Sequence, residues 1–351
     1  MLHAKTIGGK LAFGWLALVV FLALFAPFLP FHDPKRPFLN ALGLGPTLRG
    51  CFGIESRIVV EELYNEGDLA TDDTLASADV TSDTFADVTS DTTVDEPTDT
   101  TIPEGQTDSF GSGTPHGCHM LGTTPDGYDI LSLLANGARI SMFVAVMSVG
   151  IGGAVGGIIG IFAAFRKGFI DRLVVLLFNV VLSIPLLVLA LAFMAVLAPQ
   201  SADGSRSTFF STLVLTASLA LVVVPQLGRI ARSSAMQWVN RDFVMASRSL
   251  GATNRSVLFK RIIPNVLPSM FAVGFLAIGV VIVAEGSLAL LGAGIPGGVS
   301  WGSMVALYRG ELELRPYLVL APIVVIALTV ISTNKVGDII RQSLDQRESR
   351  I

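Results

Sequence analysis

Residues 140–165 read ISMFVAVMSVGIGGAVGGIIGIFAAF, a stretch without a single Asp, Glu, Lys or Arg. A membrane-spanning helix needs about 20 mainly apolar residues, so this stretch is long enough to cross a bilayer. Five other stretches have the same character, and we therefore predict an all-α, polytopic membrane protein with six transmembrane helices. The predicted spans are residues 11–29, 140–165, 173–198, 211–230, 269–291 and 317–333.

The composition of the whole chain fits a protein that lies largely in lipid. Hydrophobic residues make up 51% of the 351 residues, charged residues make up 15%, and the mean hydropathy is +0.65. Soluble domains carry roughly 25% charged residues, and a soluble fold of this length could not bury so much apolar surface. The sequence contains no P-loop, no nucleophile–His–acid arrangement and no zinc-type Cys/His spacing. We therefore predict no enzyme activity, no cofactor, no metal site and no nucleic-acid partner.

Glycines and prolines predict how the spans pack and bend. Gly152, Gly156 and Gly160 follow small-xxx-small spacing, which lets two helix backbones approach closely in lipid. The neighbouring helix could belong to this chain or to a partner. Pro185 and Pro225 lie inside predicted spans and are expected to kink them.

Basic residues are distributed unevenly among the segments that join the spans. Sixteen Lys and Arg lie in the N-terminus, residues 166–172, residues 229–261 and the C-terminus, and eight lie in the other segments. Basic residues concentrate on the cytoplasmic side of a membrane. We therefore predict that both termini are cytoplasmic, which is consistent with an even number of spans.

A long acidic segment separates the first two spans. Residues 58–138 hold 17 of the 28 Asp and Glu and no Lys or Arg. Such a composition cannot offset the chain entropy lost on folding, so we predict that residues 58–110 form a disordered insert outside the membrane. Cys51 and Cys118 flank this insert, and the sequence leaves open whether they form a disulfide or stay unpaired.

The segment between the fourth and fifth spans, residues 231–268, carries the most informative pattern. Phe243, Ala246 and Leu250 have helical spacing, and Gly251 can end the short helix that they indicate. The segment is basic and amphipathic and lies on the side predicted to be cytoplasmic. A helix of this kind could rest on anionic lipid or dock into a groove of a soluble partner.

Residues of this loop follow a recognisable order: Met245-Ala246-Ser247, then Gly251, then Ile262-Ile263-Pro264. The order resembles the EAA loop of bacterial ABC-importer permeases, with Met245 and Ser247 in place of the first Glu and the second Ala. In that family the loop is a coupling helix that docks onto the ATPase subunit. The resemblance implies coupling to an ATPase by Arg241, Asp242, Phe243, Ala246, Leu250 and Gly251.

Five further motifs lie at residues 121–129, 137–141, 284–292, 300–304 and 337–345. Together they resemble the C-type permease of the dipeptide, oligopeptide and nickel transporters. The resemblance implies a type I ABC-importer permease in the cell inner membrane, with a translocation pathway for peptides or related small solutes. It also implies three partners: a second homologous permease, cytoplasmic ATP-binding subunits that hydrolyse ATP on a separate chain, and an extracytoplasmic solute-binding protein.

Glu285 is the one acidic residue inside a predicted span. A charge at the bilayer centre costs about 2.5–3.5 kcal/mol on insertion scales, so Glu285 is expected to face the protein interior or a water-filled path. It could line or gate the translocation pathway. It could instead make a structural hydrogen bond with Ser287 or with a neighbouring helix.

The predicted organisation has four parts: a cytoplasmic N-terminus with the first span, an extracytoplasmic region, a five-helix permease core and a cytoplasmic tail. Their bounds are residues 1–35, 36–135, 136–340 and 341–351. Two alternative functions stay open, namely a gradient-driven secondary transporter or channel and a membrane anchor that displays the acidic segment. The first usually shows several intramembrane charges or paired broken helices, and the second does not need a long basic loop.

Overall fold

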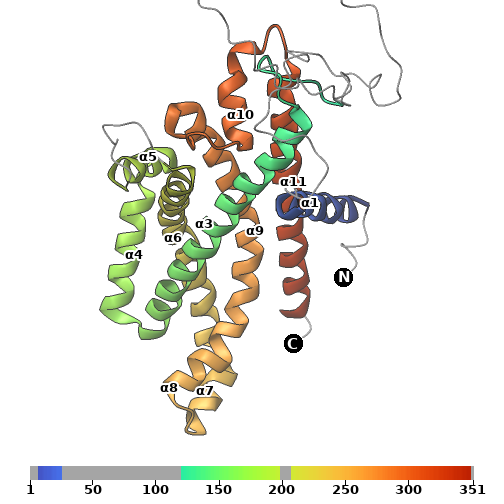
Figure 1. Ribbon diagram of the computed structural model, residues 1–351. Coiled ribbons are helices and arrows are strands. Elements are labelled where there is room, and N and C mark those ends of the chain that lie inside the picture. The colour runs from blue at the N-terminus through green and yellow to red at the C-terminus, as the bar shows by residue number, and fades with distance from the viewer. Residues whose placement is uncertain (1–6, 26–119, 198–206, 349–351) are drawn as a thin grey trace, which may run out of the picture. The chain divides into compact units, whose positions relative to one another are not determined.

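The computed structural model describes residues 7–25, 120–197 and 207–348, and almost all of them are helical (Figure 1). In the described residues the only strand-like pairing is a bridge between Thr123 and Asp129. The predicted insert at 58–110, Cys51 and Cys118 lie outside these residues. The elements are α1 (Ile7–Phe25), α3 (Ile130–Arg166), α4 (Gly168–Leu182), α5 (Leu186–Leu197), α6 (Thr208–Val239), α7 (Asp242–Ser249), α8 (Asn254–Val257), η4 (Leu258–Ile262), α9 (Ile263–Leu288), η5 (Ala289–Ala293), α10 (Trp301–Tyr308), η6 (Arg309–Glu311) and α11 (Tyr317–Glu348).

The apolar helices confirm the predicted fold class, except that one predicted span is sharply bent. Five helical runs are long and apolar enough to cross a membrane: those that contain α1, α3, α6, α9 and α11. The predicted span 173–198 is not one helix but two, because α4 and α5 meet at an angle of 93°. Pro185 lies at this break, where a kink was expected, and counting the bent pair as one span gives six. Pro225, in contrast, lies inside the unbroken helix α6.

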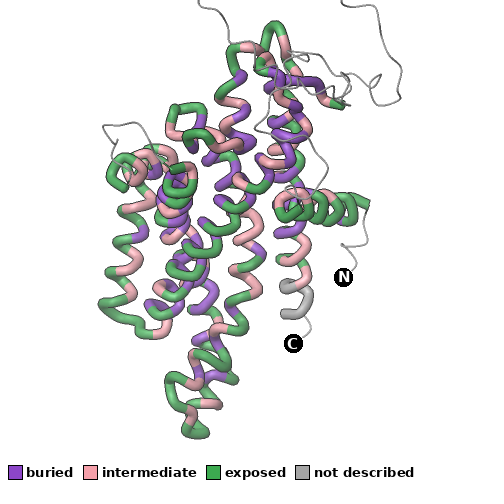
Figure 2. The backbone as a smooth tube through the Cα atoms, in the orientation of Figure 1, coloured by how far each residue is buried: buried purple, intermediate pink, exposed green. Residues whose placement is uncertain are grey.

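Helices α3 and α6 form the most extensive helix pair of the described chain. The glycine stripe of α3 faces α6: a Cβ at Gly152 would lie 2.7 Å from the Ala220 carbonyl oxygen. A Cβ at Gly156 or Gly160 would overlap the carbonyl oxygen of Val224 or Gly228. The close packing predicted from the glycines is thus confirmed, and the helix that they contact belongs to the same chain. Figure 2 shows buried residues along both helices.

An ion pair fixes α4 against α6 near one end of both helices. The guanidinium of Arg232 donates to both carboxylate oxygens of Asp171, at 2.5 and 2.7 Å. Further along, the ring of Phe178 covers Gly228, where a Cβ would lie only 2.6 Å from the ring. These contacts hold α4 alongside α6 at Asp171 and Phe178.

Two helices run across the domain boundaries predicted at 136 and 341. Helix α3 begins at Ile130 because the Asp129 side chain accepts a hydrogen bond from the Ser132 N–H at 2.9 Å and caps the helix. It continues past Arg139, whose side chain is exposed and therefore does not interrupt the helix. Helix α11 extends to Glu348. The assignment of the four parts to the two sides of the membrane remains a prediction.

Candidate functional site

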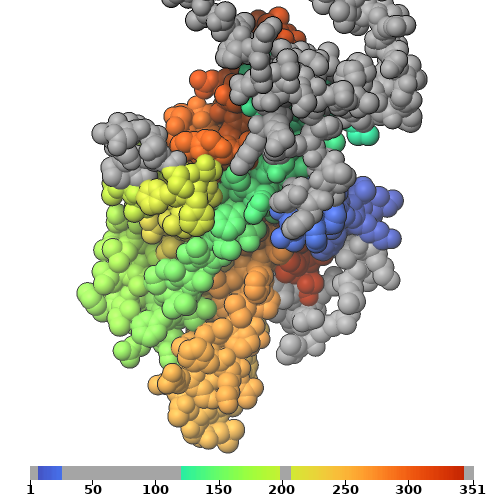
Figure 3. Space-filling view, in the orientation of Figure 1, coloured from blue at the N-terminus to red at the C-terminus, as the bar shows by residue number. Residues whose placement is uncertain are grey.

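The loop that joins α6 to α9 projects beyond the ends of the neighbouring helices (Figure 3). It consists of the short helices α7 and α8 followed by a π-helical turn, η4, which continues into α9. The predicted bounds of the loop, 231–268, include the end of α6 and the start of α9. All six residues predicted to couple to an ATPase lie within or beside α7.

The inner side of the loop is buried against the membrane helices. Val244, Val257 and Ile262 are each at most 1% exposed. They pack in one cluster with Ile161 and Ala164 of α3, and the same cluster includes residues near the end of α6. Because native interiors are close-packed and poorly compressible, the loop and the adjoining ends of α3, α6 and α9 form one packed unit.

Gly251 ends α7 as the sequence predicts. Its φ of 84° lies in the left-handed region, which side chains with a Cβ rarely adopt. The Gly251 N–H donates to the Arg248 carbonyl and the Ala252 N–H donates to the Ser247 carbonyl, both at 3.0 Å. This is the Schellman arrangement of a helix C-terminus, and it turns the chain sharply after Leu250.

The outer side of the loop presents apolar side chains to the surroundings. Leu250 is 88% exposed, and Phe243, Met245 and Phe259 are also exposed. The predicted stripe of Phe243, Ala246 and Leu250 therefore faces outward. Contiguous exposed apolar residues on a protein mark an interaction surface. We call the exposed side chains of Phe243, Met245, Ala246 and Leu250 the loop surface.

Basic side chains border the loop surface. The guanidinium of Arg241 lies 5.4 Å from the Trp238 ring centre, and that of Arg248 lies 5.5 Å from the Phe165 ring centre. Both distances are within the range of cation–π attraction, which orients these arginines against α6 and α3. Asp242 is exposed in the first turn of α7. The roles of these residues in coupling stay predictions.

Glu285 is buried at the junction of three segments. It is only 2% exposed, and its carboxylate accepts from the Ser300 hydroxyl at 2.6 Å and from the Ser141 hydroxyl at 3.4 Å. Ser287, considered from sequence as a partner, instead donates to the Val283 carbonyl of its own helix. Glu285 of α9 is thus joined to α3 and to the residue that precedes α10.

The same three segments are joined by further contacts around Glu285. The Trp301 N–H donates to the Ser141 hydroxyl at 3.1 Å, and the Trp301 indole N–H donates to the Leu134 carbonyl at 3.0 Å. Ser300 also forms a reciprocal capping box with Ser303 at the start of α10. Gly302 lies against Gly286 so closely that a Cβ on Gly302 would be 2.5 Å from the Gly286 Cα. We call Glu285, Ser141, Ser300 and Trp301 the α10 anchor.

Sequence reasoning found Glu285 and the motif at 300–304 but did not connect them. A serine and a tryptophan at a helix start give no signal of a partner 160 residues away, so this pairing requires the fold. In the described ranges no group of three His, Cys, Asp or Glu side chains could hold a metal ion.

A bundle of long apolar helices with one projecting loop packed against them is the architecture of a multi-pass membrane protein. Residues 156–350 match the family of binding-protein-dependent transport system inner membrane components. The chain belongs to this family. It is therefore a multi-pass inner-membrane subunit of an ATP-driven importer that works with ATPase and solute-binding partners, and neither a gradient-driven carrier nor a membrane anchor is favoured.

Three relatives of this chain are transport permeases. The glutathione transport system permease GsiD of Pectobacterium atrosepticum is 28% identical over 66% of this chain and 74% of its own length. The di/tripeptide transport system permease DppC of Pseudomonas aeruginosa is 32% identical over 65% of this chain and 72% of its own length. The dipeptide transport system permease DppC of Alkalihalophilus pseudofirmus is 30% identical, over 66% and 73%.

A solved structure has the same fold. The chain is similar to a chain of the MetNI methionine ABC transporter in an inward-facing conformation, with a TM-score of 0.51 and 18% sequence identity. The similarity covers 61% of this chain and 97% of that chain. At this identity the likeness concerns the helix arrangement and not the solute.

Proposed function

We propose that this chain forms one half of a translocation pathway for di- or oligopeptides or related small solutes, and that a second homologous permease forms the other half. The relatives that resemble it are peptide and glutathione permeases. ATP would be hydrolysed on separate cytoplasmic subunits, because this sequence contains no P-loop. An extracytoplasmic binding protein would deliver the solute, and both termini would lie in the cytoplasm.

One observation carries this proposal: the loop surface is apolar and exposed outside, while its inner side is packed against α3, α6 and α9. Such a surface fits a groove on a soluble partner, and a helix laid into a groove is a recurrent mode of recognition. Closure of the ATPase subunits on binding ATP would displace the loop. The loop would pass that movement to the helices and open the pathway to alternate sides. Coupling requires that the contacts differ between the two states.

A mild-detergent pull-down of the chain from its native membrane, analysed by mass spectrometry, tests the proposed partners. We expect a second permease and P-loop ATPases to accompany the chain. Recovery of the chain alone across several detergents would contradict the proposed assembly.

Replacement of Leu250 by Asp is expected to lower ATP-driven peptide uptake at least about tenfold, because the new carboxylate would lie unpaired in an apolar interface. A cost of about 1.4 kcal/mol is enough for a tenfold loss of docking. Leu250 contributes nothing to the core, so the amount of membrane-inserted chain should stay unchanged. Uptake and ATP hydrolysis would be measured in proteoliposomes that contain the purified complex.

Two controls separate loss of docking from loss of folding in the Leu250→Asp variant. Leu250→Met keeps an apolar side chain of similar size and should retain uptake. Asn254→Asp adds the same charge at the exposed start of α8, where a helix N-terminus tolerates an acid. Unchanged uptake in both Leu250→Asp and Phe243→Asp would remove the loop surface from the mechanism.

A further inference from the structure

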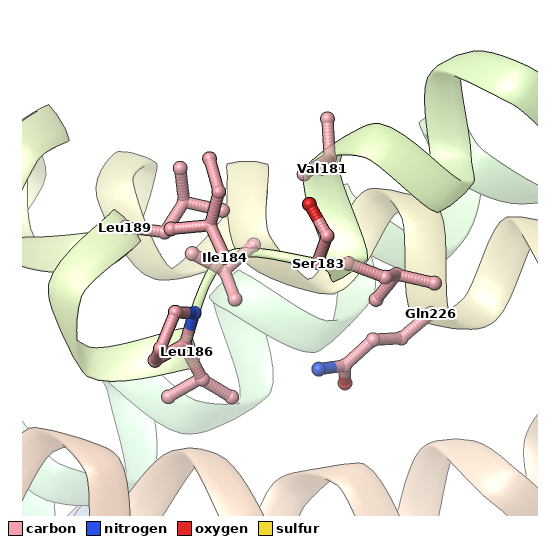
Figure 4. A pocket seen from close by; sticks show the side chains of 9 residues that line it. Val181, Ser183, Ile184, Leu186, Leu189 and Gln226 are labelled. Atoms are coloured by element: carbon pink, nitrogen blue, oxygen red, sulfur yellow. The ribbon is translucent and has the colours of Figure 1, made fainter.

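We propose that the cavity at the bend between α4 and α5 is a solute contact point on the translocation pathway, where the Gln226 carboxamide binds a peptide group. This inference rests on the proposed import of peptides. The cavity has a volume of about 240 Å³ and is lined by residues 181–186, Leu189, Val222 and Gln226. Figure 4 shows the Gln226 side chain extending from α6 into the space beside the bend.

The bend lies within the thickness of the membrane. Helix α4 has 15 residues, which at 1.5 Å per residue span about 22 Å, whereas the hydrocarbon core of a bilayer is about 30 Å thick. Asp171 and Arg232, the polar pair near the beginning of α4, mark its end at the membrane surface. The helix therefore breaks before it has crossed the hydrocarbon.

A break at this depth requires water or protein around it. Ser183, Ile184 and Pro185 are not helical and are exposed on the surface of this chain. Irregular backbone at membrane depth is tolerated only where it is buried in protein or lines a water-filled cavity, because unsatisfied polar groups in lipid cost several kcal/mol each. The cavity is located at this break, and Ser183 and Gln226 in its lining offer hydrogen bonds to water when no solute is present.

Gln226 has the chemistry that a peptide group needs. A carboxamide donates two hydrogen bonds through its NH₂ and accepts at its oxygen, whereas a peptide group offers one donor and one acceptor. Within the part of the chain that the structure describes, the Gln226 side chain makes no hydrogen bond. The partner that it lacks is supplied by water or by a passing peptide.

The other lining residues favour passage over tight binding. Val222, Leu186 and Leu189 are apolar, and no charged side chain of the described residues lines the cavity. The site can therefore accept the backbone of peptides with different side chains. Ligand pockets that enclose a drug-sized molecule have volumes of roughly 300–1,000 Å³, so this smaller cavity holds only part of a peptide. Weak contact suits a pathway, because a solute must also leave the site.

Cysteine labelling in the assembled transporter tests both the water and the peptide. In a chain with Cys51 and Cys118 replaced by Ser, Gln226→Cys is expected to react with a membrane-impermeant thiol reagent in proteoliposomes. A transported dipeptide or tripeptide, added with ATP and the binding protein, should slow this reaction. Leu221→Cys on the same helix is the matched control, because Leu221 is an exposed apolar residue outside the cavity and a thiol in hydrocarbon does not ionise.

Peptide uptake gives a second measurement. Gln226→Leu removes the hydrogen bonds while keeping an apolar side chain of comparable size, and it should lower uptake about tenfold with the complex still assembled. This inference would be overturned if Gln226→Cys did not react, or if peptide did not slow its reaction while peptide uptake proceeds. Either result would leave the proposed function intact. If the unmodified complex showed no ATP-driven peptide uptake, the proposed function would be overturned instead. A peptide would then also no longer be the expected ligand of the cavity.

Discussion

A chain with Gly156→Leu is expected to insert into the membrane and then fail to pack. A Cβ at this position would overlap the Val224 carbonyl oxygen and lie 3.0 Å from the Gly228 nitrogen. These are backbone atoms of α6, so no side-chain rotation can relieve the overlap and the two helices must separate. We expect a loss of at least about 3 kcal/mol in stability, at the upper end of overpacking costs or beyond. Fluorescence-detected size-exclusion chromatography in mild detergent would measure the folded fraction and its thermal midpoint.

Gly150→Leu provides the matched control for this experiment. Gly150 lies on the same helix and is exposed, and no atom lies within 4 Å of the position that a Cβ would take there. The two variants make the same change in helix propensity and hydrophobicity on one helix, so they differ only in the atoms that surround the new side chain. If Gly156→Leu folded as well as Gly150→Leu, the close packing of α3 on α6 would not determine the stability of the fold.

Hydropathy and glycine spacing predict the long spans and the close contact on one face of α3, because both are local signals in the sequence. The five long spans follow from apolar length, and the end of α7 follows from Gly251, whose left-handed backbone conformation is a property of that residue. Small-xxx-small spacing likewise predicts a close contact on one face of α3. This spacing does not identify the helix on the other side of the contact, and only the fold shows that this helix is α6.

The bend and the α10 anchor could not be predicted to the same extent. Pro185 predicts a kink, but a hydropathy window over 173–198 averages across the break and cannot distinguish a gentle kink from a turn of 93°. Glu285 is recognisable as a costly acid in a span, yet its partners depend on which segments meet in space. For the loop surface, helical spacing predicted that Phe243, Ala246 and Leu250 share one face. It did not predict that Val244 faces inward.

The surroundings of Glu285 favour the structural one of its two predicted roles. Both carboxylate oxygens accept hydrogen bonds from buried serines, and those serines also accept from backbone N–H groups of α10. Glu285 is also absent from the described residues that line the cavity at the bend. A group whose oxygens are occupied by partners on neighbouring segments has the geometry of an anchor. A gating role would need one of these contacts to break during transport.

Substitution of Glu285 by Leu and by Gln separates these roles. Glu285→Leu leaves the Ser300 and Ser141 hydroxyls buried without their acceptor, and each such group costs about 1–3 kcal/mol. Glu285→Gln can still accept from Ser300 through its amide oxygen and donate to Ser141 through its NH₂, because both partners are hydroxyls. For an anchor, thermal stability and uptake should fall together in Glu285→Leu and stay near the original in Glu285→Gln. A Glu285→Gln chain that keeps its thermal midpoint but loses peptide uptake would show that the ionisable carboxyl group itself acts in the pathway.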